Sequence, residues 1–186
     1  ANSNYENFQY VDAVKTYEKV AKKGYKSVEL FQKLGNAYYF QGKLEEANKW
    51  YIELFNMNQS VDAEYYFRYA QTLKAVGDYK KANQIMAEFN AKNSSDLRGK
   101  LAKSQTDYLE EIKKNSGRYK IENAGINSPF SDYGAAFYKD AIVFTSARDS
   151  SGVSGRKHSW TNQSYTNLYI ATKSDDNNLG IPEKFS

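Results

Sequence analysis

The sequence contains no cysteine and only one histidine, His158, among its 186 residues. Without cysteine there can be no disulfide, no thiolate nucleophile and no cysteine-based zinc site, although both cytoplasmic and periplasmic proteins share this composition. With one histidine, a histidine-based catalytic triad has a single candidate base, and a metal site must rely on carboxylates. We expect His158 to be a solvated loop residue.

The sequence also lacks a long apolar run and a marked excess of one charge. No stretch approaches the roughly 18 apolar residues of a membrane span. The 26 basic and 22 acidic residues are interspersed, with 13 basic and 11 acidic residues in each of the ranges 1–92 and 93–186. Such a chain has no basic stripe to match a phosphate backbone, so we expect no nucleic-acid partner.

A repeat runs through the first half of the chain. Its aligned segments are FQYVDAVKTYEKV from Phe8, GKLEEANKWYIEL from Gly42 and GDYKKANQIMAEF from Gly77. The alanines Ala13, Ala47 and Ala82 are 34 and 35 residues apart, and larger residues follow each of them on the same helical face. This period resembles that of tetratricopeptide repeats. The alternative is an unrelated helical bundle whose apolar stripe recurs.

Residues 28–41, VELFQKLGNAYYFQ, supply the first complete partner helix. Phe31, Leu34, Gly35 and Tyr38 resemble the tetratricopeptide pattern W-x2-L-G-x2-Y, with Phe in place of Trp. Opposite Ala47, Gly35 is expected to let two helix backbones approach closely. The same positions of the next repeat hold Tyr66, Tyr69, Ala70 and Leu73.

Residues 1–116 are thus predicted to form a short tetratricopeptide α-solenoid of about two and a half repeats plus a capping helix. The chain is expected to begin inside the first repeat, which would contribute only its second helix, ended by Gly24. Residues 95–114 predict the capping helix, whose polar outer side would close the array. Its apolar face would comprise Leu97, Leu101, Tyr108 and Ile112.

Residues 117–186 change to the alternating and short apolar runs of β-strands. Tyr133, Ala135 and Phe137 alternate, residues 142–144 form a continuous apolar run, residues 166–172 predict a third strand, and PEKFS predicts the start of a fourth. A continuous apolar run indicates a strand covered on both faces, and we expect that nothing in these 186 residues can cover it twice. The predicted fold class is therefore α+β.

The stretch INSPFSDYGAAFYKDAIVFTSARD, followed by TNLYIAT, resembles a PD40 or WD40-like propeller blade. Tetratricopeptide repeats followed by such a blade resemble the multidomain OmpA-family proteins of Bacteroidetes, some of which belong to the type IX secretion machinery. The resemblance implies that residues 117–186 are an incomplete first blade, and that a peptidoglycan-binding domain would lie outside this sequence. Because a propeller needs about four blades or more to close, we expect the chain to be a fragment of a longer protein.

Catalytic motifs are absent from the sequence. Residues 150–157, SSGVSGRK, match neither the P-loop nor the nucleophile-elbow pattern, and we interpret them as a loop between strands. The glutamate pairs at 45–46 and 110–111 are interpreted as solvated charges on helix exteriors. We predict a non-enzymatic protein with no catalytic residue, metal site or cofactor.

The candidate binding surface is the inner face of the solenoid, to which the first helix of each repeat contributes. By repeat position it comprises Gln32, Asn36, Tyr39, Phe67, Arg68, Gln71 and Lys74. Asn36 and Arg68 could hold a peptide backbone or carboxylate, while Tyr39 and Phe67 offer apolar contact. The weak resemblance to carboxylate-clamp repeats ends at Gln32, which stands where those repeats carry lysine. The alternative is that the capping helix or the propeller fills this groove.

These features predict a non-enzymatic cell-envelope scaffold that binds protein partners of the periplasm or outer membrane. In the full protein the resemblance implies peptidoglycan anchoring through domains absent here, and a link to type IX secretion. The alternative function is a periplasmic module that binds or senses a glycan or small ligand.

Overall fold

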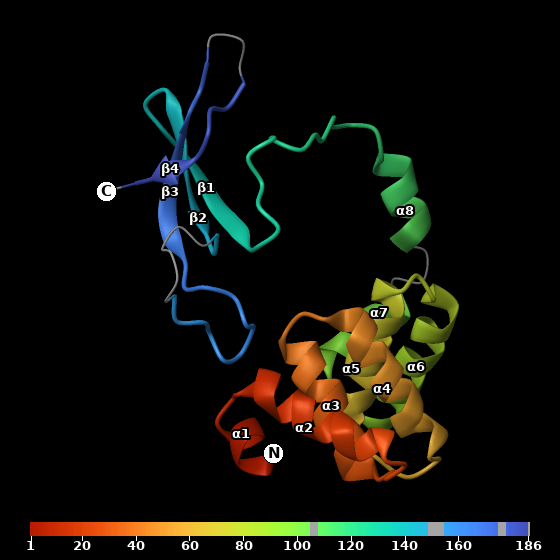
Figure 1. Ribbon diagram of the computed structural model, residues 1–186. Helices are drawn as coiled ribbons and strands as arrows, with labels where there is room; N and C mark the ends of the chain where they lie inside the picture. The colour runs from red at the N-terminus through yellow and green to blue at the C-terminus, as the bar shows by residue number, and fades with distance from the viewer. Residues whose placement is uncertain (105–107, 149–154, 175–177, 186) are drawn as a thin grey trace. The chain divides into compact units, whose positions relative to one another are not determined.

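The computed structural model describes residues 1–104, 108–148, 155–174 and 178–185, although nothing is described of the Tyr108 side chain. The chain forms two compact units, Ala1–Asn115 and Ser116–Ser186 (Figure 1). The first unit is helical and the second contains a small antiparallel sheet, so the protein has the predicted α+β fold class. No helix in the described ranges is long and apolar enough to cross a membrane.

The helical unit consists of consecutive helices. They are α1 Asn2–Glu6, α2 Tyr10–Lys22, α3 Val28–Phe40, α4 Leu44–Asn56, α5 Ala63–Ala75, α6 Tyr79–Lys92, α7 Leu97–Ser104 and α8 Tyr108–Asn115. Short turns join those from α1 to α7. The most extensive packing joins α3 to α4 and α5 to α6, so two helix pairs follow one another along the chain. Each pair is linked by a turn whose glycine, Gly42 or Gly77, has a positive φ of 74° or 83°.

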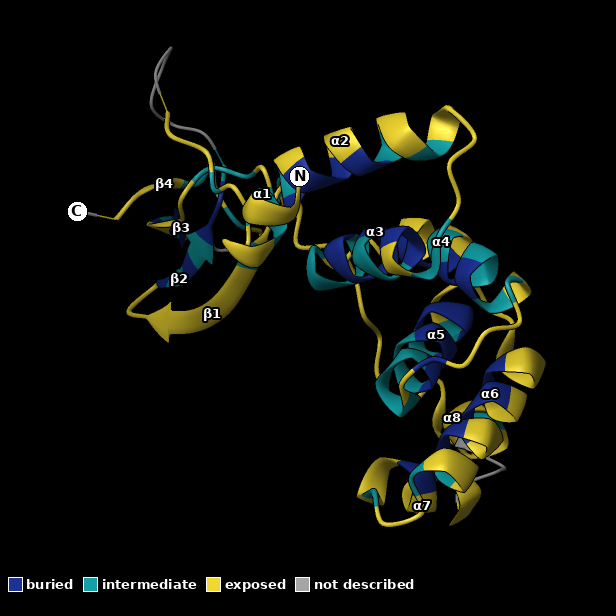
Figure 2. Ribbon diagram, turned by 90° about the horizontal axis from the view of Figure 1, so that it is seen from below, coloured by how far each residue is buried: buried dark blue, intermediate teal, exposed yellow. Residues whose placement is uncertain are grey.

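The recurring small residues lie where the helices meet. Ala13, Ala47 and Ala82 are all completely buried, as are the large side chains of Tyr51 and Phe89. Figure 2 shows this buried stripe along the inward sides of the helices. Val20, which the repeat places on the same face as Phe89, is exposed.

Gly35 lies where α3 packs against α4. A Cβ atom built on Gly35 would collide with the ring of Tyr51, which lies one helical turn after Ala47. The glycine thus serves close packing, but the group that it admits is the Tyr51 ring and not the predicted backbone opposite it at Ala47.

Local signals fix several helix ends. Ser27, Asp62 and Asp78 cap α3, α5 and α6 by accepting a hydrogen bond from a backbone N–H in the first turn. Gly24 follows the last turn of α2 with φ of 89°, a left-handed conformation that favours glycine. The predicted end of this helix is confirmed.

The two ends of the array differ in how they meet the prediction. The first repeat does not consist of its second helix alone, because the five-residue helix α1 precedes α2. The capping segment 95–114 is helical over α7 and over α8, and residues 105–107 between them lie outside the described residues.

The predicted apolar face of the capping helix is not its packing face. Leu97, Leu101 and Ile112 have exposed fractions of 65%, 47% and 60%. Instead α7 meets α6 through Gly99, where an added Cβ would crowd Asn90, and it meets α5 through Arg98, whose guanidinium lies 4.2 Å from the ring centroid of Phe67. Apolar periodicity failed here because a glycine and a stacked arginine make the contact.

The second unit contains one antiparallel sheet in the order β1-β2-β3-β4. Its strands are β1 Asp132–Tyr138, β2 Ala141–Ser146, β3 Asn167–Thr172 and β4 Glu183–Lys184. The turn between β1 and β2 contains Lys139 with φ of 51°, and the register shifts between Tyr133 and Ala136 beside Gly134. All four predicted strands are therefore present.

The core of the sheet lies on one face, where Phe144, Tyr169 and Ala171 pack together with Ile126 and Leu179. The opposite face of β2 is only half-buried at Val143, so the described residues do not cover this strand fully on both faces, as expected for a chain that cannot cover it twice. The edge strand β1 is largely exposed, and Phe137 has an exposed fraction of 86% (Figure 2).

Two predictions fall on loops of this unit. Of the glycine-rich loop 150–157, residues 150–154 lie outside the described residues. His158 lies in a loop as predicted but is half-buried, and its Nδ1 accepts a hydrogen bond from the Trp160 backbone N–H at 3.2 Å.

Candidate binding surface on the helical unit

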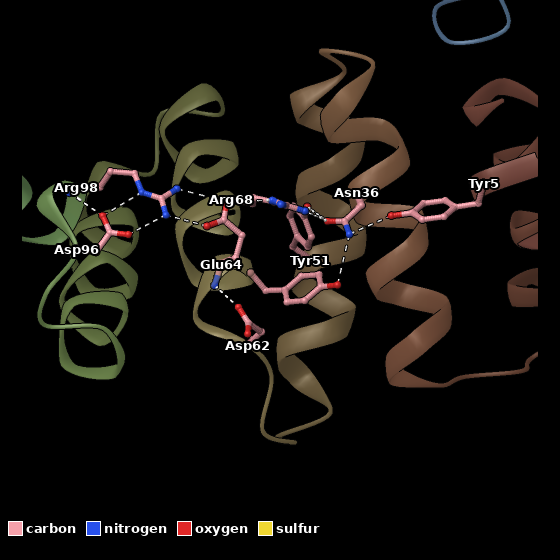
Figure 3. Close-up of polar contacts among 9 residues, drawn as sticks. Tyr5, Asn36, Tyr51, Asp62, Glu64, Arg68, Asp96 and Arg98 are labelled. Carbon is pink, nitrogen blue, oxygen red and sulfur yellow. Dashed lines mark hydrogen bonds and ion pairs between the residues drawn. The ribbon is translucent and has the colours of Figure 1, made fainter. Parts of the chain in front are cut away.

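The seven residues predicted to line the groove come from two helices, Gln32, Asn36 and Tyr39 from α3 and Phe67, Arg68, Gln71 and Lys74 from α5. The structure brings two of them into direct contact, because Arg68 Nη1 donates a hydrogen bond to Asn36 Oδ1 at 2.8 Å (Figure 3). This contact lies at the centre of a polar network that extends from α1 to α7.

Asn36 is the hub of the network. Its Nδ2 donates to the hydroxyl oxygens of Tyr5 at 3.2 Å and Tyr65 at 3.4 Å, and its Oδ1 also accepts from the Tyr51 hydroxyl at 2.8 Å. With Arg68 this makes four partners for an amide that offers two donors and two acceptor lone pairs. Asn36 is buried and its hydrogen-bonding capacity is satisfied within the chain.

Two tyrosines at the hub, Tyr5 and Tyr51, are held in their neutral form. Burial raises the pKa of Tyr51 far above its usual value, although the nearby Arg68 charge opposes the shift. Burial also raises the pKa of Tyr5, against the hydrogen bond from Asn36. The hydroxyl groups therefore remain available as hydrogen-bond donors over the whole physiological pH range.

Arg68 is fixed on several sides. Its Nε lies 3.4 Å from Glu64 Oε1, and its guanidinium lies 4.9 Å from the ring centroid of Phe40 and 5.9 Å from that of Tyr39. A planar guanidinium suits both the carboxylate and the aromatic faces. Arg68 therefore acts within the helical unit as a structural bridge between α3 and α5.

A second arginine continues the network to α7. Arg98 Nη2 lies 2.9 Å from both Glu64 Oε2 and Asp96 Oδ2, and the two arginines therefore share Glu64 (Figure 3). The hydrogen bonds from Arg98 lower the pKa of the Asp96 carboxyl. Because each guanidinium faces a carboxylate of the chain, a partner carboxylate would have to displace Glu64.

The predicted set consequently divides into two groups. Asn36, Arg68, Tyr39 and Phe67 are engaged in contacts within the chain, and Phe67 lies beneath Arg98. Gln32 and Gln71 are half-buried and make no side-chain hydrogen bond with any part of the chain that the structure describes. Lys74 is also half-buried.

Sequence reasoning missed five members of the network, namely Tyr5, Tyr65, Glu64, Asp96 and Arg98. The repeat spacing offered a signal, because Glu64 and Arg98 stand 34 residues apart and each is the second residue of its helix, α5 and α7. The predicted alternative, a groove covered by the capping helix, is met in part because Arg98 of α7 covers Phe67.

A separate polar cluster lies in the sheet unit and was also missed. Arg148 Nη2 contacts Asp132 Oδ1 at 3.2 Å and donates to the Ile126 carbonyl oxygen at 2.7 Å, while its Nε donates to Ser146 Oγ at 2.8 Å. Desolvation raises the pKa of Asp132, but hydrogen bonds from Ser146, Ser128 and Arg148 outweigh it and lower the value to about 2. The cluster ties the segment before β1 to the end of β2, which is a structural role.

No group of three or more potential metal ligands occurs among the described residues. The chain was also compared with protein-family models, with curated proteins and with solved structures, and none of these comparisons found a match.

Proposed function

We propose that the chain is a non-enzymatic scaffold of the tetratricopeptide type that binds protein partners of the bacterial cell envelope. The observation that carries the proposal is the succession of two helix pairs at a constant spacing. Phe31, Leu34 and Gly35 of α3 correspond to Tyr66, Tyr69 and Ala70 of α5, and all six residues are buried. Stacked repeats of this kind present extended surfaces for protein partners.

The sheet unit supports the second half of the proposal, in which residues 117–186 are one blade of a PD40-like propeller. A four-stranded antiparallel sheet with consecutive strands as neighbours is the repeating unit of propellers. Neighbouring blades of a longer protein would cover exposed apolar side chains such as Tyr133, Phe137 and Leu168.

The envelope location, the link to type IX secretion and the anchoring to peptidoglycan rest on the resemblance to OmpA-family proteins. Within the predicted groove, Gln32 and Gln71 are the residues most suited to contact a partner, because their side chains make no hydrogen bond with the part of the chain that the structure describes. Gln32 and Gln71 lie about one helical turn from Asn36 and Arg68, and their amides offer donors and acceptors to a peptide backbone.

The test is in-cell cross-linking of the full protein in its source organism, followed by affinity purification and mass spectrometry. We expect periplasmic and outer-membrane proteins to be recovered. The double variant Gln32→Glu/Gln71→Glu should reduce their recovery by about tenfold or more without changing the thermal unfolding midpoint, because it places two charges on the binding surface.

The matched control is Gln84→Glu, which makes the same chemical change at an exposed position of α6. Recovery in this variant should equal that of the unaltered protein. Partners drawn only from the cytoplasm would contradict the envelope assignment, and undiminished recovery in the double variant would exclude this surface.

A further inference from the structure

A cavity of about 460 Å³ lies between α2, α3 and α4. Its apolar walls include Ala21 of α2, Phe31 and Tyr38 of α3, and Trp50 of α4. Phe31 and Trp50 are stacked with their ring centroids 6.0 Å apart and their planes 26° apart. Its size falls in the range of ligand pockets, and none of the residues predicted for the groove lines it.

The repeat explains why this space is empty. With the spacing of 34 and 35 residues set by the buried alanines, Ala21 of α2 corresponds to Phe55 of α4 and to Asn90 of α6. Phe55 packs against α5, with its ring centroid 4.8 Å from that of Tyr66 and 4.6 Å from that of Tyr69. Tyr66 is the repeat counterpart of Phe31. The Phe55 ring of α4 therefore fills the space beside Tyr66 of α5, whereas Ala21 of α2 leaves the corresponding space beside Phe31 of α3 open.

Asn90, the third residue of this series, also leaves a cavity beside the next helix, as Ala21 does. A smaller cavity of about 360 Å³ lies between α6 and α7, and Asn90 lines it. The Asn90 Oδ1 atom is buried and has no hydrogen-bond partner among the described residues. Among Ala21, Phe55 and Asn90, only the phenylalanine ring fills the space beside the next helix.

Charges surround the first cavity in equal number, with Lys22, Lys26 and Lys49 opposite Glu18, Glu46 and Glu53. Several are already paired: Glu18 accepts a hydrogen bond from the Tyr38 hydroxyl at 2.7 Å, and Lys26 lies 3.5 Å from Glu53. A balanced and partly neutralised rim does not select an ion. The selectivity of this site lies in its aromatic walls.

We propose that this cavity is a docking site for an aromatic side chain of a protein partner. The partner ring would lie against Phe31 of α3 as the Phe55 ring of α4 lies against Tyr66 of α5. Aromatic rings pack favourably edge-to-face and offset against other rings, and Phe31, Trp50 and Tyr38 provide such neighbours. The site is separate from the surface at Gln32 and Gln71, and its test does not require the chain to be an envelope scaffold.

The test uses N-acetyl-phenylalaninamide as the probe and follows the indole N–H resonance of Trp50 by NMR spectroscopy of the full chain. The unaltered protein should show a saturable shift, with intermolecular nuclear Overhauser contacts from the probe ring to Phe31 and Trp50. Ala21→Phe, which supplies the ring found at Phe55, should abolish the shift. Lys19→Phe adds the same ring at an exposed position of α2 that does not line the cavity, and it should leave binding unchanged.

Several outcomes would overturn the proposal. A linear, non-saturating shift with no intermolecular contacts would exclude the site in the unaltered protein, even if Ala21→Phe failed to fold. Equal binding of N-acetyl-leucinamide would show a general apolar groove without aromatic preference. A shift of Trp50 on raising the protein concentration alone would assign the cavity to a second copy of this chain.

Discussion

At the scale of single residues, the structure gives a different role to Asn36 and Arg68, the two groove residues predicted to hold a peptide backbone or carboxylate. Asn36 and Arg68 were selected because an amide and a guanidinium can hold a peptide. They instead bind each other and the surrounding tyrosines, since burial makes an unpaired polar group costly and the chain supplies partners for all of them. The helical period predicted where these side chains lie. The partners could not be predicted, because Tyr5 and Arg98 belong to elements whose position depends on tertiary packing.

The ion pair between Asp132 and Arg148 gives a prediction about pH. The pKa of Asp132 is lowered from the usual 3.8 to about 2, so its contribution to the stability of the sheet is fully present above about pH 4 and is lost as the pH falls towards 2. Asp132→Asn should lower the free energy of unfolding by about 1–3 kcal/mol at neutral pH, because it removes the charge that Arg148 and the serines bind.

The measurement is the urea midpoint of the Phe144 and Tyr169 amide resonances in the unaltered protein and the variant over a pH series. The difference between the two midpoints should be largest above about pH 4 and should shrink towards pH 2. A difference that stays constant over this window would show that ionisation of Asp132 contributes nothing.

At the scale of elements, α3 and α4 show which sequence signals are strong. The alanine spacing and the glycine of α3 together predicted the helices and their packing faces, because these signals repeat with the helical period. Helix α7 shows the reverse, since its leucines indicated one face while Gly99 and Arg98 make the contacts. A close approach at glycine and a stacked arginine carry no apolar periodicity, so the sequence alone pointed to the wrong side.

Gly35 provides the prediction at this scale. Gly35→Ala would raise the intrinsic helix propensity by about 1 kcal/mol, yet the new methyl group would collide with the rigid ring of Tyr51. We expect net destabilisation of about 1–3 kcal/mol in urea unfolding followed by helical circular dichroism. In a Tyr51→Leu background the same substitution should be neutral or stabilising. An equal loss in both backgrounds would show that the Tyr51 ring is not the obstacle.

At the scale of the whole molecule, helices and strands separate along the chain into a helical unit and a sheet unit. Composition and periodicity predicted this separation, because the change from a period near 3.6 to a period of 2 is visible in the sequence itself. The covering of the sheet could not be predicted in the same way, since the alternation of side chains does not reveal which face finds a partner.

Since most of the packing of the helical unit is internal, we predict that it folds without the sheet unit. A chain shortened to residues 1–116 should keep its helical circular dichroism and unfold cooperatively on heating. Complete loss of the helical signal would show that residues 117–186 are required for the helices to form. The full chain measured under the same conditions is the reference.

The polar network of Figure 3 also has a mechanical consequence. Its links Asn36–Arg68 and Glu64–Arg98 join α3 to α5 and α5 to α7, and the Arg68–Glu64 pair connects them within α5, so they fasten the stack along one side. Bending that spreads α3, α5 and α7 apart must break these charged links, whereas bending in the opposite sense leaves them intact. The stack should therefore resist bending in the first direction more strongly than in the second.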